Sequence, residues 1–203
     1  PTYQWLKERY RDKWDEAALR ELVVYVELWR ICHRLGLEVL ASGIGTLSNK
    51  YVEWHHSGIL DKYDFIVVPV EVLAAKRTIR VSDVVAFIDV TGHNAVETRE
   101  KRGKARQEEL IPCVLSHKVL YAVHHGIDER VIICHHNDYT GAIRCLSAKS
   151  IYNLKKQGKI KTMKLYRDEK PYWCLRANQM YYIGRLRDVL DYLKQLRIDK
   201  VMS

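Results

Sequence analysis

The feature that most constrains the fold of this chain is an apolar run, Val84 to Ile88, that ends abruptly in the carboxylate of Asp89. Uninterrupted apolar runs of this length are typical of central strands that are buried on both faces. A second acid, Asp64, opens another apolar run, Phe65 to Val68. If the two strands lie side by side, both carboxylates can be directed at one divalent cation, for which they are suitable ligands.

The charge of the chain favours a polyanionic partner. Its 203 residues carry a formal net charge of +9, and phosphates attract Lys and Arg side chains whatever the base sequence. Nucleic acid is therefore the first expectation, and a basic protein without such a partner is the alternative. No run approaches the roughly 20 apolar residues needed to span a bilayer, and the start of the chain does not resemble a signal peptide. We expect an intracellular protein with no membrane segment.

The five cysteines are scattered along the chain and form no CxxC pair. Neither a zinc site nor a secreted disulfide framework is indicated, while a single disulfide is left open. No repeat, low-complexity segment or Pro/Gly/Ser-rich linker divides the sequence. We therefore predict one continuous domain over residues 1–203.

Helical and strand patterns alternate along the chain, which predicts an α/β fold with a mixed sheet flanked by helices. The segment 70–81 is apolar but ambiguous. The predicted helices cover residues 15–35, 97–110, 148–156 and 185–196. The predicted strands cover residues 37–41, 64–68, 84–89, 119–124, 131–136 and 142–146, and a hairpin turns at 167–170.

Glu21 lies on the apolar face of the first predicted helix, together with Val24 and Leu28. Glu27 lies instead on a charged stripe that we expect to face solvent. A lone carboxylate on an apolar face is costly unless it is paired, protonated or close to a metal. Glu21 is therefore a candidate third acid for the cation site. The alternative is a position at the helix margin, from which it reaches water or an arginine.

Taken together, these elements resemble the PD-(D/E)XK nuclease superfamily, and most closely the archaeal Holliday junction resolvases. That family begins with a helix bearing a Glu, followed by a Gly, a strand, a Ser/Gly-rich loop, a strand led by Asp and a strand that ends in Glu-x-Lys. The likeness covers about residues 16–196, and the composition fits a viral member from a hyperthermophilic archaeon, located in the host cytoplasm. The matching positions are Glu21, Gly36, Ala41–Gly43, Asp64 and Asp89–Thr91.

The resemblance implies a restriction-endonuclease-like fold and metal-dependent cleavage of branched DNA, such as Holliday junctions, in recombination, replication or repair. Asp64, Asp89 and the carbonyl of Val90 would bind Mg²⁺ or Mn²⁺, with Glu21 binding the ion directly or through water. A homodimer is expected as well, because a junction resolvase makes two symmetric cuts. The aromatic residues near the two ends of the chain are candidates for its interface.

The same resemblance assigns roles to two polar residues. Ser42 would touch a DNA phosphate or the active site of the partner subunit, and Gln107 would orient a water or a base. Two groups of basic residues are candidate DNA contacts, with a solvated helix face or hairpin as the alternative for each. They are Lys101, Arg102, Lys104 and Arg106 in the first group and Lys155 and Lys156 in the second.

One departure from the family pattern affects the chemistry. Thr91 occupies the position of the lysine that usually orients the attacking water, and a Thr can hydrogen-bond water but supplies no charge. Either another cation reaches the site, for which Lys76 and Lys104 are candidates, or the enzyme is slow or inactive. The alternatives to a junction nuclease are therefore a nuclease of the same fold with another DNA substrate and a catalytically silent DNA-binding protein.

Overall fold

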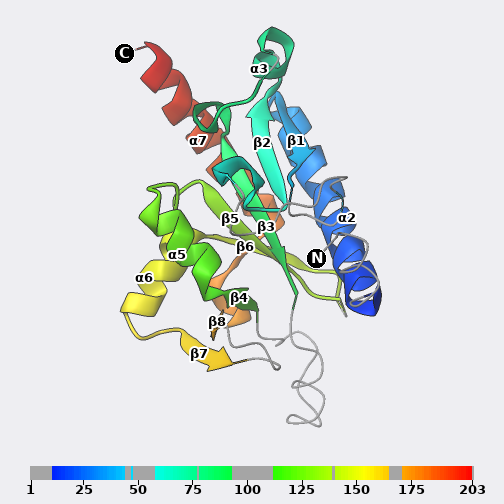
Figure 1. The fold of residues 1–203 in the computed structure, drawn as a ribbon, viewed down its shortest axis with the longest axis vertical. Coiled ribbons are helices and arrows are strands. Elements are labelled where there is room, and N and C mark those ends of the chain that lie inside the picture. The colour runs from blue at the N-terminus through cyan, green and yellow to red at the C-terminus, as the bar shows by residue number, and fades with distance from the viewer. Residues whose placement is uncertain are drawn as a thin grey trace. The chain divides into compact units, whose positions relative to one another are not determined.

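A computed structural model of the protein describes residues 11–43, 47, 58–76, 78–92, 112–138, 140–164 and 171–202 (Figure 1). The chain divides into two compact units, of which unit 1 comprises Pro1–Asp89 with Gly184–Ser203 and unit 2 comprises Val90–Ile183. Both units combine strands with helices, so the α/β class predicted from the sequence is confirmed. The organisation as a single domain stays a prediction. No helix within the described ranges is long and apolar enough to cross a membrane.

Unit 1 is built on an antiparallel group of strands in the order β1-β2-β3. All of β2 is buried, as is β3 up to Asp89, which agrees with their uninterrupted apolar sequences. The strands are β1 (Leu37–Ala41), β2 (Phe65–Pro69) and β3 (Ala86–Thr91), whose last two residues begin unit 2. The helices are α2 (Arg11–Arg34), α3 (Val70–Ala75) and α7 (Leu186–Met202), with the 3-10 turns η1 (Ile59–Asp61) and η2 (Val81–Asp83).

Helix α2 packs on β1, beside which it lies in Figure 1, and it also contacts α7. Its buried face contains Val24 and Leu28, both fully inaccessible to solvent. On its outer face Glu27 forms an ion pair with Arg30 at 2.7 Å, so the predicted division between an apolar and a charged face is confirmed. The helix ends before Gly36, whose φ of 65° lies in the left-handed region that glycine adopts without steric cost.

Unit 2 contains two antiparallel groups of strands, β5-β6-β9 and β4-β8-β7. Helices α5 and α6 lie side by side (Figure 1). The strands are β4 (Cys113–Leu115), β5 (Val131–His136), β6 (Ile143–Ser147), β7 (Lys161–Lys164), β8 (Pro171–Cys174) and β9 (Tyr181–Tyr182). The helices are α5 (Ser116–His124) and α6 (Ala148–Lys156), with the 3-10 turns η4 (Ala177–Gln179) and η5 (Ile183–Arg185), the latter passing into unit 1.

A disulfide joins Cys113 to Cys174. The two residues are cross-strand partners in the register of β4 and β8, so the bond reinforces a pairing that backbone hydrogen bonds also make. Cys32, Cys134 and Cys145 are buried free thiols. The single disulfide that the cysteine count leaves open is therefore present, and the prediction of no larger framework agrees with the described cysteines.

The strand predicted over residues 119–124 is wrong, because this segment belongs to helix α5. The buried residues of α5 are Ser116, Val119 and Ala122, whose spacing of three is helical, while Leu120 between them is 46% exposed. The ambiguous segment after β2 contains α3 and η2. The helix predicted over 97–110 lies outside the described residues.

Candidate active site

Asp64 and Asp89 lie at the same end of β2 and β3. The register pairs Phe65 with Ile88. Asp64 directly precedes Phe65, in a bend before β2, and Asp89 directly follows Ile88 on β3. Both acids are buried, with 6% and 2% of their surface exposed. The register therefore brings two buried acids to the same end of these neighbouring strands.

Ser42 ties the end of β1 to the same place. Its backbone N–H donates to the carbonyl of Asp64 at 2.8 Å, and its hydroxyl donates to the carbonyl of Leu60 at 3.1 Å. Ser42 is itself buried, so both of its donors serve the segment that carries Asp64. This is a positioning role, and the contact with DNA or with a partner subunit that the family resemblance implies for Ser42 stays a prediction.

Glu21 is buried on α2, and its Oε2 accepts a hydrogen bond from the backbone N–H of Leu47 at 3.2 Å. One helical turn further on, Tyr25 packs against Phe65 with ring centroids 5.8 Å apart. Phe65 directly follows Asp64, so these contacts hold this part of α2 at the start of β2. Among the residues that the structure describes, no three His, Cys, Asp or Glu side chains are arranged to hold a metal ion. The described residues thus contain a pair of acids at one end of β2 and β3, with the helix that carries Glu21 packed at the start of β2, and not a formed three-acid cage.

The acid pair fits the requirements of a hard divalent cation. Mg²⁺ prefers oxygen ligands and is commonly held by one or two carboxylates together with waters and substrate phosphates, without a cage made only of protein atoms. Asp64 and Asp89 supply two such carboxylates, and the carbonyl of Val90 is the next backbone oxygen along β3. A third carboxylate ligand is therefore not required for a site of this kind.

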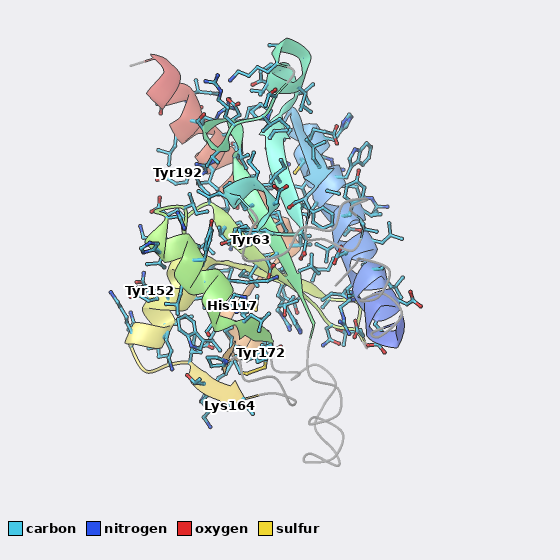
Figure 2. The ribbon with its side chains drawn as sticks, in the orientation of Figure 1. Tyr63, His117, Tyr152, Lys164, Tyr172 and Tyr192 are labelled. Atoms are coloured by element: carbon cyan, nitrogen blue, oxygen red, sulfur yellow. A yellow bond between two sulfur atoms is a disulfide. The ribbon has the colours of Figure 1, made fainter. Side chains whose placement is uncertain are left out.

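Lys62 is a buried residue that sequence reasoning did not single out. Only 4% of its surface is exposed, and it is the one buried lysine within the described part of the chain. It directly follows η1 and precedes Asp64 by two residues, and burial lowers the pKa of its ammonium group. Between them, Tyr63 packs on Phe87 of β3 with ring centroids 5.9 Å apart (Tyr63 is labelled in Figure 2). The sequence offered only a weak signal for it, a lysine two residues before an acid-led strand.

Thr91, at the position of the missing lysine, and Lys76, a candidate to replace it, both have other partners, and the second candidate, Lys104, lies outside the described residues. The hydroxyl of Thr91 donates to the carbonyl of Cys113 at 2.7 Å, which gives Thr91 a structural role, and its role in catalysis stays a prediction. Lys76 forms an ion pair with Asp83 at 2.6 Å. Asp83 precedes β3, whereas Asp89 lies near its other end, so Lys76 is held at the end of the strand remote from the acid pair.

Lys155 and Lys156 lie at the end of α6, beside aromatic rings. The ammonium of Lys155 donates to the hydroxyl of Thr162 at 2.6 Å and lies 5.9 Å from the centre of the Trp173 ring. Lys156 lies 4.7 Å from the centre of the Tyr152 ring, and Figure 2 labels Tyr152 on this helix. We call this exposed lysine-rich surface of unit 2 the basic surface. It continues through Lys159, Lys161 and Lys164, all of them exposed.

The remaining predicted site residues cannot be placed. Gln107 and the first group of basic residues lie outside the described residues, and their roles stay predictions. That group comprises Lys101, Arg102, Lys104 and Arg106.

Comparison with known proteins agrees with a nuclease. Residues 15–190 match the family model described as viral/archaeal nuclease. The chain is 34% identical over 176 residues to the uncharacterized protein D-244 of Sulfolobus spindle-shape virus 1, a match that covers 86% of this chain and 67% of that protein. It also resembles the solved structure of D212, a nuclease from a fusselovirus, with 25% identity, a TM-score of 0.56 and 96% of each chain covered. Because the family model spans most of the sequence, including all three candidate acids, the chain belongs to the viral/archaeal nuclease family.

Proposed function

We propose that this protein is a metal-dependent endodeoxyribonuclease that hydrolyses phosphodiester bonds in branched DNA, such as Holliday junctions. The observation that carries this proposal is the buried pair formed by Asp64 and Asp89 at adjacent strand ends. Two like charges held close together in a buried place are costly, and such pairs are retained where a cation or a reaction requires them. Membership of a nuclease family makes phosphodiester hydrolysis the reaction that fits this pair.

In the proposed reaction a water oxygen attacks the phosphorus atom, a new P–O bond forms, and the P–O bond to one deoxyribose breaks. The departing sugar oxygen takes up a proton as the water loses one. Bound Mg²⁺ or Mn²⁺ would lower the pKa of a coordinated water and offset the negative charge that develops on the phosphate. Asp64 and Asp89 would hold the ion, and the carbonyl of Val90 would add a backbone ligand.

The other residues of the site act by holding this pair in place. Ser42 fixes the segment before β2 through Leu60 and Asp64. Glu21 receives the backbone N–H of Leu47, and we assign to its carboxylate an outer position, from which it binds the cation through water. A rigid arrangement of this kind reduces the reorganisation that the reaction requires.

The basic surface on α6 and β7 supports binding to a DNA backbone. Its lysines are exposed, apart from the half-buried Lys155, and phosphate contacts from such side chains position nucleic acid without reading its sequence. Recognition of a branched shape therefore suits this surface better than recognition of a base sequence. We further propose a homodimer, because two cuts placed symmetrically across a junction call for two active sites. Tyr181 and Tyr182 on the short strand β9 are 58% and 61% exposed and are candidates for its interface.

The experiment that tests this function compares four substrates under three ionic conditions. The purified protein is incubated with a four-way junction, a flap, linear duplex and single-stranded DNA in Mg²⁺, in Mn²⁺ and in EDTA. We expect cleavage with either metal and none in EDTA, with the four-way junction cut fastest and at two symmetric positions. Denaturing gels that resolve each labelled strand measure the rates and the cut sites.

Each outcome is informative. Equal rates on branched and linear DNA would support a nuclease of another substrate class and remove the junction assignment. Binding without cleavage under every ionic condition would support the silent DNA-binding alternative. Cleavage that persists in EDTA would overturn the metal dependence.

A further inference from the structure

We propose that Lys62 contacts the scissile phosphate and supplies there the positive charge that Thr91 lacks. This inference rests on the proposed nuclease function and identifies one further catalytic residue for it. It concerns unit 1 alone, which contains Lys62, Asp64 and Asp89.

The position of Lys62 is fixed by contacts on both sides. Ser42 bonds to the carbonyls of Leu60 and Asp64, the residues two positions before and two positions after Lys62. Within this short interval the chain leaves η1 with Lys62 in a helical conformation (φ −81°, ψ −21°). The segment that carries Lys62 is therefore attached to the end of β1 at the same end of the strands as the acid pair.

Tyr63 fixes the same segment against β3. It is completely buried, and its ring packs on that of Phe87. Phe87 precedes Asp89 by two residues on β3, so the segment is anchored next to both acids of the pair. Lys62 thus lies between two anchored residues, and its own surface is 4% exposed.

Burial of a lysine at this place requires a reason. Removing an ammonium group from water is costly unless negative charge compensates it, and along the chain Lys62 lies between two acids, Asp61 directly before it and Asp64 two residues after it. A lysine is also the residue that many phosphate-binding sites use as a compact positive charge with three donors. The same ammonium can therefore balance the acid pair in the free protein and the phosphate oxygens in the complex.

The position of Lys62 also explains how the site could work with a threonine at position 91, where the family pattern has a lysine. The hydroxyl of Thr91 is bonded to the carbonyl of Cys113 and carries no charge, while Lys76 is ion-paired with Asp83 near the opposite end of β3. Among the lysines that the structure describes, Lys62 is the one that is both buried and within two residues of a site acid. The positive charge would reach the phosphate from the strand led by Asp64 instead of the strand that ends at Thr91.

The first measurement tests proximity without activity. Isothermal titration of Mg²⁺ into the DNA-free protein is compared for wild type, Lys62→Met and the charge-matched control Lys76→Met. Removing a positive charge beside the acid pair should tighten Mg²⁺ binding by about threefold or more, because the repulsion between two cations is lost. The Lys76→Met control should leave it unchanged. Equal affinities in all three proteins would overturn the inference.

The second measurement tests the chemistry. Single-turnover cleavage of the DNA substrate that wild type cuts fastest should fall by roughly 100-fold or more in Lys62→Met, the scale expected when a group that stabilises transition-state charge is removed. Lys62→Arg keeps the charge and should stay within about tenfold of wild type. If Lys62→Arg and Lys62→Met lose the same amount of cleavage activity, the site requires the shape of the lysine side chain and not its charge. That result would overturn the inference.

Two controls separate the possible failures. Thermal unfolding checks that the variants are folded, and Lys62→Gln replaces Lys62→Met if the latter is not. If wild type cleaves DNA and Lys62→Met cleaves equally well, the role of Lys62 is wrong and the proposed function stands. If wild type cleaves no substrate with any metal, the proposed function is wrong and the inference fails with it.

Discussion

The two ends of β3 each carry a buried acid, and the surroundings of these acids differ. At the first end, Asp83 accepts hydrogen bonds from the Lys76 ammonium at 2.6 Å and the Arg80 backbone at 2.9 Å, with Arg197 of α7 at 3.8 Å. At the other end, Asp89 lies at the same end of the strands as a second buried acid, Asp64. Asp83 is thus held by the donors and positive charge around it, whereas Asp89 shares its end of the strands with another acid.

This difference is the one that we expect between an acid that stabilises the fold and an acid that serves the proposed reaction. The contacts of Asp83 lower the pKa of its carboxyl group, first through the Lys76 hydrogen bond and then through the Arg80 backbone, so its charge favours the folded state. Two ionised carboxylates held close together would oppose folding unless positive charge compensates them. Burial alone therefore does not identify an active-site acid, and the charges around the acid must be considered as well.

The largest effect that we expect is on activity at the Asp89 end. Asp64→Asn and Asp89→Asn should each lower single-turnover cleavage by at least about 100-fold, because each removes a charged ligand and transition-state stabilisation. Their unfolding free energies should change by less than about 1 kcal/mol, since relief of repulsion offsets lost hydrogen bonding. Gel-based rates and denaturant titrations measure the two quantities.

The matched control for this pair is Asp61→Asn. Asp61 lies on η1, three residues before Asp64, and we expect its replacement to leave the rate unchanged. If Asp89→Asn stays active, or if Asp61→Asn is as slow as Asp64→Asn, the acid pair is not specifically required for cleavage. The contrast between the Asp89 and Asp83 ends of β3 would then be wrong.

The next effect is on stability at the Asp83 end. Asp83→Asn should lower the free energy of unfolding by about 1.5–3 kcal/mol at neutral pH, the cost of losing hydrogen bonds to a buried charged group. Cleavage per folded molecule should stay as in wild type. Urea titration gives the first quantity, and initial rates below the unfolding transition give the second. If the Asp83→Asn variant is as stable as wild type but inactive, Asp83 takes part in catalysis.

The smallest effect is a dependence of stability on pH. Because the pKa of Asp83 is lowered from its usual 3.8, its stabilising contribution is complete above about pH 4 and is lost as the pH falls through the folded-state value. The difference in unfolding free energy between wild type and Asp83→Asn should therefore shrink as acid is added below pH 4. Denaturant titrations at several pH values measure it. A difference that stays constant down to pH 2 would contradict this account.

Much of the fold of unit 1 follows from sequence patterns. The apolar runs before Asp89 and after Asp64 predict buried strands, and their antiparallel pairing then brings the two acids together. The face of α2 that carries Glu21 is also predictable, because helical periodicity separates it from Glu27. These features depend on residues close together in sequence, for which pattern and structure are tightly coupled.

The features that could not be predicted depend on contacts between distant segments. The apolar residues around Val119 suit a strand or a helix equally well. The structure shows a helix, α5, whose buried residues recur every three positions. Lys62 looks like a surface residue in the sequence, and only the attachment of its segment to Ser42 and Phe87 shows that it is buried. The pairing of Cys113 with Cys174 likewise depends on which strands become neighbours.

Helix α7 has a consequence for how the protein is made. Lys194 donates a hydrogen bond to the carbonyl of Leu35, and Arg197 approaches Asp83, so α7 completes a unit whose other elements lie before residue 90. During translation the ribosome must synthesise all of unit 2 before α7 emerges. We therefore expect unit 1 to reach its final packing late, only after Lys194 and Arg197 have left the ribosome and can contact Leu35 and Asp83.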